Sequence, residues 1–110
     1  MNGILGITGL LLDTGHATFA GGDPAALLDR WIHRACHVHC KDVRRDVAAI
    51  ARNREWSFLE AVLNGVFTVP GDGCVEFAPV IARLRQHGYQ GWLVVEAEQD
   101  PVIADRKSVV

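Results

Sequence analysis

Short, largely apolar runs recur along the chain, and each carries a polar side chain at its end or next to it. The runs cover residues 9–13, 35–40 and 92–96. Runs of this length are typical of strands buried in a parallel sheet. In the second run, alternation places His37 and His39 on one face, because strand side chains repeat every two residues. The pattern predicts three strands; a second interpretation of the middle one is a strand whose histidines are held only by hydrogen bonds.

A helix is predicted between the first two runs. Asp23 and Pro24 suit the N-cap and the first helical position. The residues expected on its apolar face are Leu27, Leu28, Trp31 and Ile32. We expect Trp31 and Trp92 to lie in the core.

Further helices are predicted between the second and third runs. A short helix is expected over residues 46–51, and Ser57 and Glu60 have the spacing of a capping box. Residues 67–73 carry the turn residues of a loop, and an amphipathic helix is expected over about residues 76–87. Strands that alternate with helices through short connectors predict an α/β fold with a parallel sheet.

Each predicted strand ends near a side chain that can bind a metal. These side chains are Asp13, His39 and Glu96. Because the carboxyl ends of parallel strands meet at one edge, which is where α/β sites form, we expect the three to converge. Two carboxylates and an imidazole suit manganese, cobalt or magnesium better than a zinc held by thiolates. Such a metal can polarise a carbonyl, so the residues indicate metal-assisted proton abstraction from a hydroxy-carbonyl compound.

The composition excludes several classes of partner. The chain has 110 residues and a formal net charge of −2, with no basic stripe that could neutralise phosphates, so no nucleic-acid partner is expected. No apolar run could span a bilayer and the N-terminus has no signal-type core, so we expect no membrane partner and a cytoplasmic location. Cys36, Cys40 and Cys74 lack Cys-x-x-Cys spacing and are expected to be free thiols.

Other polar side chains follow the strand ends. His16 could reach the same cavity or cap a helix or loop. Lys41 and Asp42 could form an ion pair at the rim or contact substrate oxygens. Glu98 falls on the face of the preceding carboxylate if the strand continues, whereas Cys40 alternates away and is expected to pack against a helix.

Four motifs can be read directly from the chain: Leu-Asp-Thr-Gly-His at residues 12–16, His-Val-His-Cys-Lys-Asp at 37–42, the loop at 65–73 and the segment at 91–101. With them the chain resembles the xylose isomerase-like barrels of sugar isomerases and endonucleases, and within these the inosose dehydratases. The resemblance implies a (β/α)8 TIM barrel, which needs about 250 residues. Residues 1–110 would be the C-terminal portion of this single domain, its last three β/α units with parallel strands, with a divergent tail at 101–110.

The resemblance also implies roles for individual residues. Asp13, His39 and Glu96 match three of the family's metal ligands, and the fourth, a glutamate from an earlier strand, has no counterpart here. The expected metal is Mn²⁺ or Co²⁺. The expected catalytic residues are Glu96 as base, with His16 and Lys41. The expected substrate-binding residues are His16, His37, Lys41 and Arg45.

The reaction implied by the resemblance is the dehydration of 2-keto-myo-inositol (scyllo-inosose) in inositol catabolism by a hydro-lyase. A proton would leave the carbon next to the ketone, and a β-hydroxyl would depart with acid help to give a cyclic diketone. The partner is then a small-molecule polyol ketone, and the full-length protein could form a homo-oligomer. Two alternatives stay open: a keto-sugar isomerase or epimerase, and an inactive fragment whose open strand edges pair with another chain.

Overall fold

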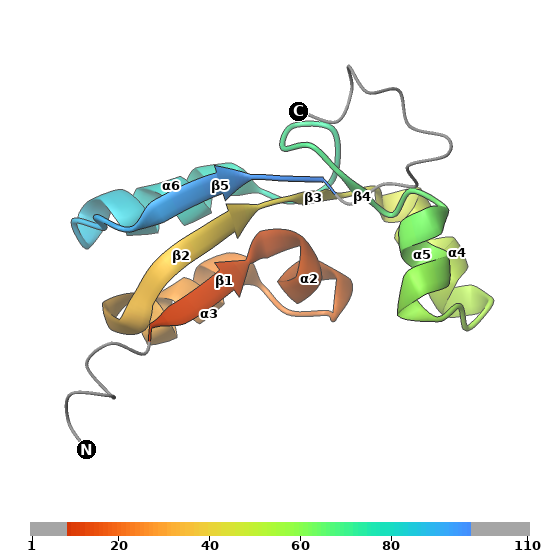
Figure 1. Cartoon of the computed structure of the whole chain (residues 1–110), viewed down its shortest axis with the longest axis horizontal. Helices are drawn as coiled ribbons and strands as arrows, with labels where there is room; N and C mark the ends of the chain where they lie inside the picture. The colour runs from red at the N-terminus through yellow and green to blue at the C-terminus, as the bar shows by residue number, and fades with distance from the viewer. Residues whose placement is uncertain (1–8, 98–110) are drawn as a thin grey trace.

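A parallel sheet forms the centre of the computed structural model, which describes residues 9–97 (Figure 1). Its strands are β1 (Leu10–Asp13), β2 (Ala35–Cys40) and β5 (Trp92–Val95), with β2 between the other two. Both pairings are parallel. The parallel α/β arrangement predicted from the apolar runs is therefore confirmed, and all three strands end at the same edge of the sheet.

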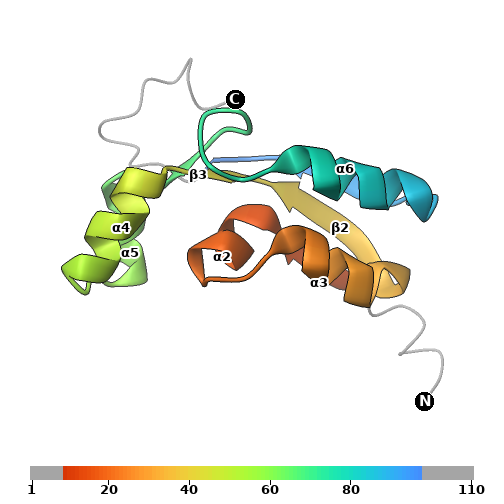
Figure 2. The same cartoon turned by 180° about the vertical axis from the view of Figure 1, so that it is seen from behind.

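Two helices cover one face of this sheet, as Figure 2 shows. They are α3 (Pro24–Trp31) and α6 (Phe77–Gln86). The core between sheet and helices contains Leu12, Val38 and Cys40 from the strands and Leu28, Val80 and Leu84 from the helices. Burial of each large aliphatic side chain in such a core contributes about 1.5–3 kcal/mol. Cys40 thus packs against the helices, as its position in the alternation predicted.

The opposite face of the sheet is open in the described part of the chain. Trp92 pairs in register with His37 and so points away from the helices that cover Val38. Trp92 is 70% exposed and Trp31 is 37% exposed, so the prediction that both lie in the core is wrong. Trp92 lies on the outer strand of the order β1-β2-β5, and Trp31 lies at the end of α3 beside the Arg30 guanidinium.

The N-cap and capping-box residues predicted from the sequence form the expected hydrogen bonds at the helix starts. The Asp23 carboxylate accepts a hydrogen bond from the Ala25 backbone N–H at the start of α3. In α5 (Phe58–Leu63), Ser57 and Glu60 form both hydrogen bonds of the capping box. The short helix expected over residues 46–51 forms as α4 (Arg45–Asn53).

A second small sheet extends beyond the strand ends (Figure 1). Its strands β3 (Asp42–Val43) and β4 (Phe67–Thr68) are antiparallel, and α4 and α5 pack with them. Residues 67–73 were predicted to be a loop, and their first two residues instead form β4. Two-residue strands carry no readable alternation, so this pairing had no sequence signal. The remaining elements are α2 (Thr14–Phe19), directly after β1, and the 3-10 turn η1 (Ile32–Arg34) before β2.

Candidate metal centre

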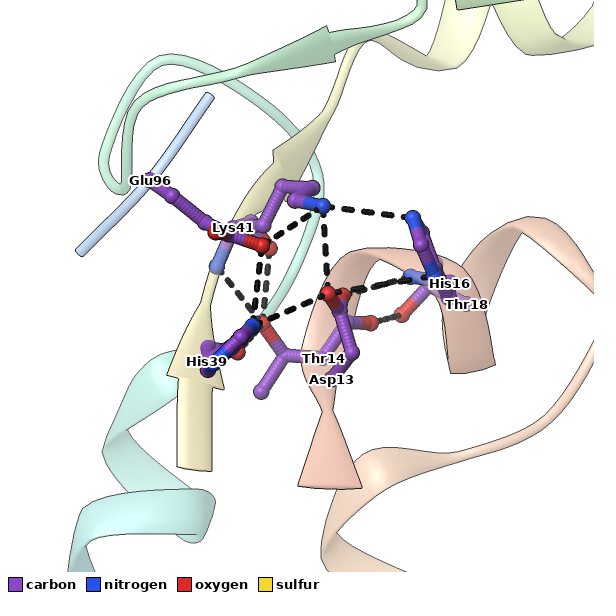
Figure 3. Close-up of polar contacts among 7 residues, drawn as sticks. All are labelled: Asp13, Thr14, His16, Thr18, His39, Lys41 and Glu96. Atoms are coloured by element: carbon purple, nitrogen blue, oxygen red, sulfur yellow. Dashed lines mark hydrogen bonds and ion pairs between the residues drawn. The ribbon is translucent and has the colours of Figure 1, made fainter. Parts of the chain in front are cut away.

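The three metal-competent side chains meet at the carboxyl edge of the sheet (Figure 3). Asp13 is the last residue of β1, and in register it pairs with His39 of β2. His39 pairs with Val94 of β5, so Glu96, two residues further along, extends from the same face. The parallel topology is what brings residues so distant in sequence together.

The donor atoms of this group lie close to one another. One donor atom each from Asp13, His39 and Glu96 can be chosen so that all lie within 4.8 Å of one another. His39 Nδ1 is 2.9 Å from Glu96 Oε1 and 3.8 Å from Asp13 Oδ2. The Asp13 side chain is 8% exposed and that of Glu96 is 36% exposed, so one side of the group remains accessible to a ligand.

These distances and donor types fit a divalent metal ion. Donor atoms bound to one octahedral ion at about 2.1–2.3 Å lie about 3 Å apart at neighbouring positions and about 4.4 Å apart at opposite positions. The two separations measured from His39 Nδ1 fall in this range. Carboxylate oxygens with an imidazole nitrogen suit divalent metal ions. The group could therefore hold such an ion with small side-chain adjustments.

Cys40 is next to His39 in sequence but takes no part in this donor set. Its side chain lies in the core under α3 and α6. Burial, and secondarily the negative charge of Asp13, raises the pKa of the Cys40 thiol. A thiol with a raised pKa stays protonated and is a poor metal ligand.

Lys41 supplies a positive charge directly beside the donor oxygens. Its Nζ is 3.1 Å from Asp13 Oδ2 and 2.9 Å from Glu96 Oε1. The side chain is fully buried, which lysine tolerates only when its charge is paired. The Thr14 hydroxyl donates to the Lys41 carbonyl and accepts from the Lys41 backbone N–H, which fixes the start of the side chain.

His16 reaches the same group from α2. The Asp13 carboxylate caps this helix, because its Oδ1 accepts a hydrogen bond from the His16 backbone N–H while its Oδ2 faces Lys41. The imidazole Nε2 lies 3.2 Å from Lys41 Nζ. The rings of Phe58 and Phe67 contact the His16 ring and hold its orientation. His16 therefore reaches the site, the first of the two possibilities that its sequence position left open.

Residues 8–109 of the chain match the family model described as the xylose isomerase-like TIM barrel. The chain belongs to the xylose isomerase-like TIM barrel family. Membership confirms the resemblance seen in the motifs. The sheet formed by residues 9–97 is one part of such a barrel, open at both outer strands rather than closed.

Named relatives within this barrel family are similar over most of the chain. The rhizopine catabolism protein MocC of Rhizobium meliloti is 60% identical over 84% of the chain. Inosose dehydratases of Geobacillus kaustophilus and Clostridium tetani are 54% and 53% identical over 86% and 87% of the chain. The matches cover 29%, 31% and 32% of these relatives, so the chain spans about a third of the length of the curated relatives it matches.

Three more residues were considered for the site from the sequence: His37, Arg45 and Glu98. His37 is on the same sheet face as His39, and their ring centroids are 5.4 Å apart in an edge-on arrangement. Arg45 is the exposed first residue of α4 and lines a surface pocket with Asp72 and Cys74. His37 therefore lies beside His39, and the substrate-binding roles of His37 and Arg45 both remain predictions. Glu98 falls outside the described residues.

Asp42 has a role that the sequence did not indicate. It was expected to pair with Lys41 at the rim or to contact substrate. Its buried carboxylate instead accepts hydrogen bonds from backbone N–H groups that follow β4 and from its own neighbour in the chain. The donors are the N–H groups of Val43, Gly71, Gly73 and Val75. Asp42 therefore anchors the loop next to the site.

Among residues 9–97, no helix has the length and apolar character needed to cross a membrane.

Proposed function

We propose that this chain provides the metal and proton-transfer residues of a hydro-lyase that dehydrates 2-keto-myo-inositol (scyllo-inosose) to a cyclic diketone. The observation that carries the proposal is the convergence of Asp13, His39 and Glu96 with a buried lysine between the carboxylates. Relatives named inosose dehydratase, more than half identical over most of this chain, support the choice of substrate.

Asp13, His39 and Glu96 would hold the metal, for which Mn²⁺ or Co²⁺ is proposed from the donor set. When bound, the ion supplies Lewis-acid stabilisation of the negative charge that develops on substrate oxygens. His37, beside His39, would support the imidazole orientation and contact substrate.

Glu96 is proposed as the general base. Its carboxylate takes the proton from the carbon next to the ketone, and the C–H electron pair becomes the C=C bond of an enediolate. The enediolate then re-forms the ketone and expels the β-hydroxyl, which accepts a proton and leaves as water; the enol that remains tautomerises to the cyclic diketone. We propose Lys41 and His16 as the donors of that proton; the support is that their Nζ and Nε2 atoms are 3.2 Å apart and that Lys41 Nζ lies 2.9 Å from Glu96 Oε1.

An isomerase or epimerase of keto sugars is the alternative reaction at the same residues. Both reactions begin with proton loss next to a carbonyl. They differ in the next step, because isomerisation returns the proton to carbon whereas dehydration protonates a leaving hydroxyl. The Lys41–His16 pair, which can serve as an acid beside Glu96, favours dehydration.

Activity is proposed to require the other β/α units of a barrel, on the same polypeptide or another. The sheet formed by residues 9–97 has strands β1 and β5 at its edges, and unpaired edges of this kind favour pairing or aggregation. A chain without those units would be an inactive fragment.

The function is tested with a chimeric protein in which this chain replaces the matching part of the Geobacillus kaustophilus inosose dehydratase. With Mn²⁺ or Co²⁺ and 2-keto-myo-inositol, we expect the chimera to form the dehydrated diketone, detected by mass spectrometry and NMR. The chain alone is expected to show no turnover. A folded, metal-loaded chimera that only isomerises or epimerises keto sugars would contradict the dehydratase assignment.

A further inference from the structure

Lys41 binds the same carboxylate oxygens that the proposed metal would use. Its Nζ contacts Asp13 Oδ2 and Glu96 Oε1 at 3.1 and 2.9 Å. These are also the oxygens that face His39 Nδ1, at 3.8 and 2.9 Å. Figure 3 shows Nζ and the imidazole converging on both carboxylates. An ammonium and a metal ion at this centre therefore compete for the same lone pairs.

The metal-free centre needs a positive charge. The carboxylates of Asp13 and Glu96 have oxygens within 4.8 Å of each other, so they repel. Partial burial strengthens this repulsion, because less water screens it. The Lys41 ammonium is fully buried and meets both carboxylates, so it supplies the compensating charge. The ammonium lies 3.1 Å from Asp13 Oδ2, and the Asp13 side chain is only 8% exposed, so little water is available to screen that carboxylate.

The position of the lysine stem is built into the fold. Thr14 holds the Lys41 backbone through hydrogen bonds to its N–H and carbonyl. The stem crosses α2 at Gly15, where an added Cβ would lie 2.8 Å from Lys41 Cγ and 2.9 Å from Cδ. A side chain at residue 15 would therefore force the Lys41 stem out of its present position beside the carboxylates.

The ammonium also contacts groups other than the two carboxylates. His16 Nε2 lies 3.2 Å from Nζ, and the Phe67 ring centroid lies 5.1 Å from it in a cation–π arrangement. Neither group belongs to the metal donor set. The lysine head can thus give up the carboxylate oxygens and still keep partners for its charge.

We propose that Lys41 is the resident counter-cation of the metal-free centre. It holds Asp13 and Glu96 together until a divalent metal binds, yields their oxygens to the metal, and turns its ammonium toward His16 and a substrate oxygen. Lys41 thereby lowers the metal affinity of the centre, but it keeps Asp13 and Glu96 together when no metal is bound. This inference rests on the metal site in the proposed function.

Calorimetric titration with Mn²⁺ at one fixed pH tests the competition. Lys41→Met removes the charge and keeps a stem of similar shape, and we expect it to bind Mn²⁺ at least about tenfold more tightly than the unsubstituted chain. Arg54→Met removes one positive charge from an exposed position after α4 and should leave the affinity unchanged. Gly15→Ala keeps every charge but crowds the stem, so it should also tighten binding, by a smaller factor.

The outcomes separate this inference from the site itself. Unchanged or weaker Mn²⁺ binding by Lys41→Met overturns the counter-cation role and leaves the metal centre intact. Absence of binding by every protein, Lys41→Met included, overturns both. Thermal melts give a second readout: without metal, Lys41→Met should melt below the unsubstituted chain, and Mn²⁺ should raise its Tm by more. A rise in the Tm of Lys41→Met that equals or falls below that of the unsubstituted chain overturns the inference. If Lys41→Met does not fold, the Mn²⁺ affinity of Gly15→Ala decides.

Discussion

Asp42→Asn is expected to destabilise the protein by about 3–5 kcal/mol, a large share of the stability of a small domain. The Asp42 carboxylate is buried and accepts from the backbone N–H groups of Gly71, Gly73 and Val75 at 2.9–3.0 Å, besides that of Val43. An amide group replaces one of the two acceptor oxygens with a donor, so two of these N–H groups would face N–H instead of oxygen. Urea denaturation followed by circular dichroism measures the loss.

Asp46→Asn is the matched control for this substitution. Asp46 is an exposed residue in the first turn of α4, and losing its charge there should cost less than about 1 kcal/mol. If both variants unfold at the same urea concentration, Asp42 does not anchor the loop. Gly73 adds a local check, because a Cβ added at this residue would collide with Asp42 Oδ1 and with the Val43 carbonyl oxygen.

Glu96→Gln is expected to reduce dehydration by the active chimera by about 10²–10⁴-fold in kcat. Glutamine keeps the size of the side chain and one oxygen near His39 and Lys41, but it cannot accept the proton from carbon. Product formation at saturating 2-keto-myo-inositol measures the loss, and calorimetry with Mn²⁺ establishes how much metal the variant retains.

Glu76→Gln is the matched control, because it makes the same substitution of glutamate by glutamine at another position. Glu76 is exposed at the start of α6, where its side chain makes no capping hydrogen bond, so kcat should stay within about twofold of the unsubstituted chimera. A Glu96→Gln chimera that binds Mn²⁺ and keeps its kcat would remove Glu96 from the role of base.

The site could be predicted from sequence to the extent that strand periodicity determines it. Residues ending a parallel strand must lie at one edge, so Asp13, His39 and Glu96 could be grouped before any distance was known. Capping signals such as Ser57 with Glu60 are equally local, and they fixed helix starts correctly.

Features that depend on distant partners were not predictable in this way. Asp42 is separated by 29 to 33 positions from the loop N–H groups it binds, and backbone donors leave no side-chain signature. The same holds for the pairing of Lys41 with two carboxylates rather than with its neighbour. Trp92 was misplaced because an apolar run shows that a strand is suited to burial, but not which elements cover it.

Titration of the purified chain with Mn²⁺ and Co²⁺ by calorimetry, with His39→Ala as the paired variant, tests the central claim most directly. His39 Nδ1 lies between the two carboxylates, so its removal takes away the nitrogen donor and leaves both oxygens in place. The account predicts saturable binding of one ion per chain that His39→Ala loses or weakens at least about tenfold. Equal binding by both proteins would show that the ion sits elsewhere and would contradict the metal centre.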